Sequence, residues 1–170
     1  MTVTAVRKDP DNLTMTLDAE FDASPDQVWT LWADPRKLER WWGPPTYPAT
    51  FTAHDFRVGG RSEYYMTGPE GPTPAGYWEI LELDPPRRLR IEDGFATDGA
   101  AGDLPGPGGM NVTIEPIDGG RTRMTIENTY PDVSTMEQLL AMGQEEGLTE
   151  AVGQIDAILA EDTVPTGAGR

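Results

Sequence analysis

The chain has 170 residues, which suits one domain. Lys and Arg number 13 against 29 Asp and Glu, so the formal net charge of −16 argues against nucleic acid and anionic membranes as partners. There is no cysteine and one histidine, His54, and we therefore expect no disulfide, no metal centre and no cofactor. No apolar run reaches the roughly 18–20 residues of a membrane span, and residues 1–10 lack the core of a signal peptide, which predicts a cytoplasmic protein.

Alternation with a period of two marks the first predicted strand, whose apolar positions are Leu13, Met15, Leu17, Ala19 and Phe21. We expect residues 1–12 to form an N-terminal arm before it. Ser24 followed by Pro25, with Gln27 three residues after the serine, predicts a capped short helix through Trp32. A second short helix begins at Asp34-Pro35, and it ends before Pro44-Pro45 because consecutive prolines cannot continue a helix.

Residues 50–128 read as strands joined by tight turns. Runs rich in apolar and aromatic residues predict strands over 51–58, 61–67, 76–83, 89–95, 110–115 and 124–128. Gly59-Gly60 and Asp118-Gly119-Gly120 are typical of hairpin turns, and the composition of residues 96–109 predicts a long exposed loop. With the first strand this makes about six or seven strands, and their short connections favour an antiparallel meander.

Residues 134–160 predict one long C-terminal helix. Ser134-Thr135-Met136-Glu137 fits a capping box, and a helical stripe follows at Leu140, Gly143, Gly147, Ala151, Ile155, Ile158 and Leu159. We expect residues 161–170 to be a flexible tail. Because a curved sheet must cover its concave face, the chain predicts an α+β helix-grip fold, with the sheet wrapped around this helix and one domain over residues 13–160.

Several segments resemble a known family. They are FDASPDQVW (21–29), DPRKLERWWGP (34–44), FRVGGR (56–61), GYWEILELDPPRRL (76–89), DGGRTRMTI (118–126) and GQEEGL (143–148). Together they are similar to the bacterial homologues of the activator of heat-shock protein 90 ATPase, within the SRPBCC (START/Bet v 1-like) superfamily. The resemblance implies a deep cavity between sheet and C-terminal helix. It also implies varied roles, which include lipid or polyketide carriers, aromatases and cyclases, antibiotic self-resistance and co-chaperones.

We expect this cavity to hold a small apolar, aromatic or lipid-like ligand. Its predicted lining is Trp29, Trp32, Trp41, Phe51, Tyr64, Met66, Trp78, Ile91, Asp93, Phe95, Met110, Val112, Met124, Ile126, Asn128, Leu140, Gly143 and Gly147. For the tryptophans the alternative is ordinary core packing. For the two glycines it is close contact between helix and sheet. Trp41 and Trp42 are adjacent and cannot both face inward on a helix, so we expect one buried and one near the rim.

Three polar residues are candidates for chemistry. Asp93 alternates with Ile91 and Phe95, so it should face inward, where desolvation would raise the pKa of its carboxyl and suit it to acid–base work. The alternative is a solvated strand end at the cavity mouth. Glu146, beside the glycine stripe, is a second carboxyl candidate unless it lies on a solvated helix face, and Tyr64 is a candidate donor.

The sequence thus supports three hypotheses. A binding module would carry or sequester a hydrophobic molecule and would need no catalytic residue. An enzyme of cyclase, aromatase or hydrolase type would use Asp93 or Glu146 in the same cavity. A co-chaperone-like interaction domain would need a basic partner surface. We expect a monomer or a weak homodimer.

Overall fold

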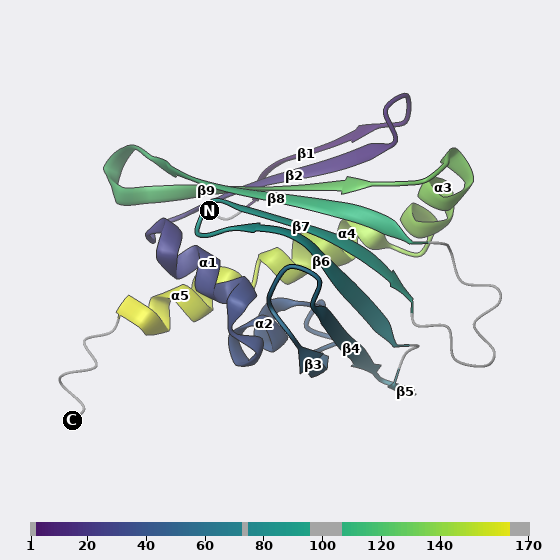
Figure 1. Ribbon diagram of the computed structural model, residues 1–170, viewed down its shortest axis with the longest axis horizontal. Helices are drawn as coiled ribbons and strands as arrows, with labels where there is room; N and C mark the ends of the chain where they lie inside the picture. The colour runs from purple at the N-terminus through teal and green to yellow at the C-terminus, as the bar shows by residue number, and fades with distance from the viewer. Residues whose placement is uncertain (1–2, 73–74, 96–106, 164–170) are drawn as a thin grey trace.

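The computed structural model describes residues 3–72, 75–95 and 107–163. Within them one antiparallel sheet runs in the order β1-β2-β9-β8-β7-β6-β4-β3, with β5 paired to β4, and the helices gather on one face of it (Figure 1). The elements are β1 (Val3–Asp9), β2 (Thr14–Phe21), α1 (Pro25–Ala33), α2 (Pro35–Trp41), β3 (Ala49–His54), β4 (Arg61–Gly68), β5 (Gly71–Pro72), β6 (Gly76–Asp84), β7 (Arg88–Phe95), β8 (Gly108–Ile117), the short 3-10 turn η2 (Asp118–Gly120), β9 (Arg121–Thr129), α3 (Val133–Ala141), α4 (Gln144–Val152) and α5 (Ile155–Thr163).

The inner face of the sheet is the face that period-two alternation predicts. Along β2 every second residue is buried, and β9 repeats the pattern. Register aligns Leu17 with Ile126 and Ile126 with Val112, and Val112 with Leu89, so one apolar row crosses four strands. Each of these side chains is at most 1% exposed. This row confirms the predicted α+β architecture of a curved antiparallel sheet with helices on one face.

The N-terminal residues are part of the sheet, so the predicted arm over residues 1–12 is wrong. Val3–Asp9 forms β1, where Val6 pairs with Leu17, and Lys8 reaches Glu145 of α4 with Nζ 2.6 Å from Oε1. Charged residues hide the alternation here, because an edge strand presents one long side to water. With β1 and the two-residue β5, the described residues hold nine strands rather than six or seven.

Both short helices begin where their capping residues predict. The Gln27 backbone N–H donates to Ser24 Oγ at 3.2 Å, and the Ser24 N–H donates to Gln27 Oε1 at 2.9 Å, which confirms the capping box. Asp34 then caps α2, since its Oδ1 accepts from the Arg36 N–H at 2.9 Å. The two helices pack against the inner face with Val28, Leu31 and Leu38 fully buried.

The predicted single C-terminal helix is wrong, because three helices cover residues 133–163. α3 begins after Asp132, whose Oδ1 accepts from the Thr135 N–H at 2.7 Å, rather than at a Ser134 capping box. Gly143 separates α3 from α4 with a left-handed φ of 91°. At the second break Gln154 donates to the Gly43 carbonyl at 2.7 Å.

The ends of the predicted segments also shift. α5 continues through residues 161–163, where a tail was expected, and β8 begins at Gly108 inside the predicted loop. The rest of that loop, residues 96–106, and residues 164–170 lie outside the described residues. Within the described part of the chain, no helix combines the length and apolar character that crossing a membrane requires.

Alanine substitution at the two glycines should separate a helix break from a helix interior. Gly143→Ala should lower the free energy of unfolding by about 1 kcal/mol, because a φ of 91° strains any residue with a Cβ. Gly147→Ala should raise it by about 0.5–1 kcal/mol, since Gly147 lies inside α4 and an added Cβ would meet nothing within 4 Å. Urea unfolding measures both. Changes of the same sign would contradict a break at Gly143.

Candidate functional site

Four tryptophans form the centre of the inner face. Trp32 comes from α1, Trp41 and Trp42 from the end of α2, and Trp78 from β6. The ring centroids of Trp32 and Trp41 are 4.8 Å apart, and those of Trp42 and Trp78 are 5.0 Å apart. Edge-to-face contacts of this kind bury large rings without gaps, so here the inner face is packed core. Trp29 lies apart and half-buried, with its ring 5.6 Å from that of Phe56.

Trp41 and Trp42 are both buried, so the expectation that one would lie near a rim is wrong. Trp41 is the last residue of α2, while Trp42 is its C-cap with an extended backbone, φ −75° and ψ 99°. Because the chain has already left the helix at Trp42, the two side chains do not follow helical spacing and both turn inward. Trp42 was absent from the predicted lining. The signal that could have placed it is Gly43-Pro44, which ends the helix at that residue.

The indole N–H groups of this cluster fall into two pairs. Trp32 Nε1 donates to Met124 Sδ at 3.3 Å, and Trp41 Nε1 donates to the Leu31 carbonyl at 3.0 Å. The buried N–H groups of Trp42 and Trp78 interact with the Tyr64 hydroxyl, but neither makes a well-formed hydrogen bond. A buried donor without a partner costs about 1–3 kcal/mol, so the second pair marks a place where the structure is not optimised for stability.

Tyr64 and Asp93, two of the three predicted candidates for chemistry, lie together beside that pair. The Tyr64 hydroxyl donates to Asp93 Oδ1 at 3.2 Å, and the Tyr64 ring stacks on Phe51 with centroids 5.0 Å apart. Gly76 on the neighbouring strand makes room, because a Cβ there would lie 2.7 Å from the Tyr64 hydroxyl. The sequence predicted that Asp93 faces inward from period-two alternation alone.

Burial dominates the electrostatics of this pair. Desolvation raises the pKa of Asp93 from its ordinary 3.8 to about 7, and the hydrogen bond from Tyr64 only partly opposes it. Burial, and then the adjacent Asp93 charge, raise the pKa of Tyr64 well above its ordinary value. Asp93 nonetheless keeps some accessible surface. A carboxyl that is crowded by protein and still reachable can hold or exchange a proton near neutral pH.

The predicted lining divides into a sealed part and a half-open part. Side chains at most 4% exposed make up the sealed part, namely Trp32, Trp41, Phe51, Trp78, Ile91, Met110, Val112, Met124 and Ile126. Partly exposed residues make up the half-open part, namely Trp29, Tyr64, Met66, Asp93, Phe95, Leu140, Gly143 and Gly147. Asn128 is 6% exposed and donates to the Met15 carbonyl at 3.4 Å. Only the half-open part can contact a ligand without prior rearrangement.

Gly147 lies one helical turn before Ala151, which is 2% exposed, so it belongs to the inward stripe of α4. Yet a Cβ at Gly147 would meet no atom within 4 Å. Close contact between helix and sheet is therefore not the reason for this glycine, and the stripe leaves open space at its position. Gly143 is explained instead by the left-handed backbone of the helix break.

Two other titratable candidates stand outside this arrangement. Glu146 is exposed on α4, as its alternative interpretation expected. His54 Nε2 lies 2.9 Å from the Trp32 carbonyl, which only accepts, so Nδ1 accepts from Ser62 Oγ at 2.7 Å. Desolvation lowers the pKa of His54, and the neutral ring acts as a structural link between α1, β3 and β4. Among the residues described, no three His, Asp or Glu side chains gather as metal ligands.

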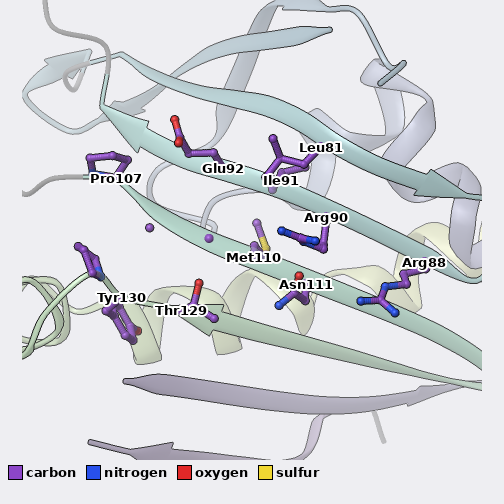
Figure 2. A pocket seen from close by; sticks show the side chains of 13 residues that line it. Leu81, Arg88, Arg90, Ile91, Glu92, Pro107, Met110, Asn111, Thr129 and Tyr130 are labelled. Atoms are coloured by element: carbon purple, nitrogen blue, oxygen red, sulfur yellow. The ribbon is translucent and has the colours of Figure 1, made fainter. Parts of the chain in front are cut away.

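A separate hollow of about 500 Å³ lies on the opposite face of the sheet (Figure 2). Its lining includes Arg88, Arg90, Glu92, Asn111 and Thr129, and the arginines alternate along β7 with the buried residues of the inner face. Arg88 also lies 3.4 Å from Glu82. This hollow is open and is lined by charged and apolar residues alike, so it differs from the predicted apolar cavity.

Comparisons place the chain among proteins of the same architecture. Residues 22–160 match the family described as Activator of Hsp90 ATPase homolog 1-like protein. No curated protein matches. A solution structure from Arthrobacter aurescens is 48% identical, over 94% of this chain and 93% of that chain, with a TM-score of 0.88. The crystal structure of Ms6760 from Mycobacterium smegmatis is 44% identical over 94% and 99%, with a TM-score of 0.83. A Rhodobacter sphaeroides protein at 22% identity, over 92% and 99%, shares the fold with a TM-score of 0.79.

Removing the charge of Asp93 should stabilise the protein at alkaline pH. Because the pKa of Asp93 is raised to about 7 in the native state, native stability falls as pH rises from 3.8 to about 7 and stays reduced above it. Asp93→Asn should therefore raise the free energy of unfolding at pH 8 by about 1–3 kcal/mol. This is less than the whole pKa shift would give, because the carboxyl keeps some solvent contact. Near pH 4 the difference should vanish. Urea unfolding across this range measures it.

Asp18→Asn is the matched control with the opposite sign. Burial alone would raise the pKa of Asp18, but Arg7, with Nη1 2.7 Å from Oδ2, and Thr125 lower it overall. Asp18→Asn should therefore destabilise the protein slightly at pH 8. An Asp93→Asn protein that is less stable than the parent at pH 8 would show that the carboxylate is well solvated or paired.

Proposed function

The chain belongs to the Activator of Hsp90 ATPase homolog 1-like family, and on that premise we propose that it binds a small, mostly apolar molecule between the sheet and helices α3–α5. The observation that carries this proposal is the open space at Gly147 on a stripe that otherwise faces the core. A bulkier residue there would fill this space, and the half-buried glycine leaves it open. An empty position on an inward stripe therefore favours an occupant.

Partly exposed apolar side chains of the sheet and of the C-terminal helices suit such an occupant. Met66, Phe95, Leu140 and Leu148 are partly exposed apolar residues from β4, β7, α3 and α4. Covering them with a ligand would gain about 25 cal/mol for each Å² of apolar surface removed from water, before ordering costs. Met66 is also adaptable in shape, which favours ligands of irregular outline. Affinity would thus come from apolar contact, and the Tyr64–Asp93 pair would orient the molecule.

Holding or sequestering one molecule in this way needs no chemical step. Binding would require the half-open part of the lining to close over the ligand. We therefore favour a carrier, sequestration or resistance role over a catalytic one.

A second candidate is an enzyme of cyclase, aromatase or hydrolase type, and the Asp93–Tyr64 contact is the observation that favours it. A carboxyl with a pKa of about 7 meets the first requirement of a general acid or base at neutral pH. The two candidates differ under Asp93→Asn. A carrier should bind its ligand with modestly changed affinity, whereas a general base should lose about 10²–10⁴-fold in turnover.

Filling the space at Gly147 should abolish uptake of an apolar probe. N-phenyl-1-naphthylamine, which fluoresces in apolar surroundings, should bind the native protein saturably with one site per chain. Gly147→Phe should weaken this binding by about tenfold or more, because its ring would occupy open space rather than displace packed atoms. Circular dichroism would show that the variant keeps its fold.

Leu81→Asp is the control, because Leu81 is an exposed residue that lines the hollow on the opposite face. It should leave probe binding unchanged. Unchanged binding in Gly147→Phe, or loss of binding in Leu81→Asp, would contradict the proposed site. Native mass spectrometry of freshly purified protein adds an independent test, since a bound small molecule that survives purification would identify the natural ligand.

A further inference from the structure

Two buried donors in the tryptophan cluster make no well-formed hydrogen bond, and they come from different elements. Trp42 caps α2 and is 7% exposed, while Trp78 lies in β6 and is fully buried. They are the only buried side-chain nitrogen or oxygen atoms without a well-formed hydrogen bond among the residues that the structure describes. Trp32 and Trp41, in the same cluster, do have partners for their N–H groups. The lack of a well-formed hydrogen bond is thus particular to Trp42 and Trp78 and is not a general property of the cluster.

Both N–H groups lie beside the Tyr64 hydroxyl. The rings of Trp42 and Trp78 each have their centroid 6.2 Å from that of Tyr64, and both indoles act to lower the pKa of Tyr64, against the larger effect of burial. Tyr64 donates its proton to Asp93, and its hydroxyl oxygen is the acceptor that the two indole N–H groups approach without making a well-formed hydrogen bond.

We infer that the molecule bound by this protein presents a neutral acceptor oxygen, as a ketone or quinone carbonyl does, to the indole N–H groups of Trp42 and Trp78. This inference rests on the proposed function and specifies the ligand class for the same site. A carbonyl oxygen has two lone pairs and can accept both N–H bonds, whereas a hydrocarbon would leave both donors without partners.

Tyr64 controls access to the two donors. It keeps accessible surface, while each indole nitrogen has almost none, so an entering ligand meets Tyr64 first. Rotation of Tyr64 away from Asp93 uncovers the N–H groups, and the ligand oxygen takes the place of the Tyr64 hydroxyl. The rest of the ligand then lies along Met66 and Phe95 at the half-open end.

An ammonium group is the other ligand feature that a buried carboxyl could attract, and the indoles argue against it. The N–H edge of an indole carries partial positive charge, so two such edges at the Tyr64 hydroxyl weaken the attraction of this site for a cation. The Tyr64 hydroxyl also occupies Oδ1 of Asp93. Electrostatics at this point therefore favour an oxygen acceptor over a basic nitrogen.

The test uses the wild-type protein labelled with ¹⁵N, whose five tryptophans give five indole N–H signals. The probes are 9-fluorenone and fluorene, which share one ring system and differ by a carbonyl in place of a methylene. Fluorenone should bind about tenfold or more tightly. It should move the indole proton signals of Trp42 and Trp78 downfield, while those of Trp32 and Trp41 change only slightly. Fluorene should bind without the downfield shift.

Variants provide the matched control. Trp78→Phe should remove most of the preference for fluorenone over fluorene, because it removes one N–H group. Trp41→Phe deletes an indole whose N–H is already bonded to Leu31, and it should keep the preference. The ratio of the two affinities in each variant makes the comparison independent of any loss in overall stability.

Other outcomes would overturn the inference in distinguishable ways. If both probes bind equally well and all indole signals move alike, the ligand class is wrong while the proposed apolar site stands. If 9-aminofluorene binds most tightly and Asp93→Asn abolishes that binding, the site recognises a cation. If neither fluorenone nor fluorene binds and N-phenyl-1-naphthylamine also fails to bind, the inference and the proposed function fall together.

Discussion

Packing of Trp32 against Trp41 and Trp78 fixes the two N-terminal helices to the inner face of the sheet. This contact determines how the rest of that face is covered. Because α1 and α2 seal it around the tryptophans, the remaining part depends on the C-terminal helices. Those helices are interrupted at Gly143 and carry no side chain at Gly147, so they cover it incompletely. The half-open part of the lining is thus a consequence of where the tight packing ends.

The loss of stability that comes with this half-open face is concentrated in a few residues. Burial disfavours the charged form of Asp93, and the N–H groups of Trp42 and Trp78 make no well-formed hydrogen bond, so each lowers the stability of the empty protein. The apolar row across β2, β9, β8 and β7 offsets that cost. Destabilising groups that lie together beside accessible space are typical of functional sites, where binding rather than folding satisfies them.

Local signals in the sequence predicted much of the fold. Alternation placed the strands because it depends only on which face is buried, and Ser24 and Gln27 placed a helix start through their mutual hydrogen bonds. β1 was missed because its charged residues mask the alternation of an edge strand. The helix break at Gly143 was missed because the spacing of this glycine in the sequence is compatible with a continuous helix. Only the folded backbone shows its left-handed φ.

The candidate site was predictable only in part. Alternation placed Asp93 on the inner face, but no pattern pairs it with Tyr64, which is 29 positions away along the chain. Trp42 was missed because helical spacing was applied one residue beyond the end of the helix. Whether an indole N–H finds a partner depends on atoms from several elements. Such a property appears only after the chain has folded.

The outer hollow and the binding site proposed beside Tyr64 differ in what binding would change. On the outer face Arg88 and Arg90 are about half exposed and lie 3.4 and 3.8 Å from Glu82, so their charges are already hydrated and paired. A ligand there would exchange contacts with water for similar contacts with protein, and the net gain would be small. Beside Tyr64 the opposite holds, because water does not reach the indole nitrogens of Trp42 and Trp78. On the proposal above, a ligand oxygen there would accept from donors that make no well-formed hydrogen bond in the protein, and this difference favours the inner face over the outer hollow.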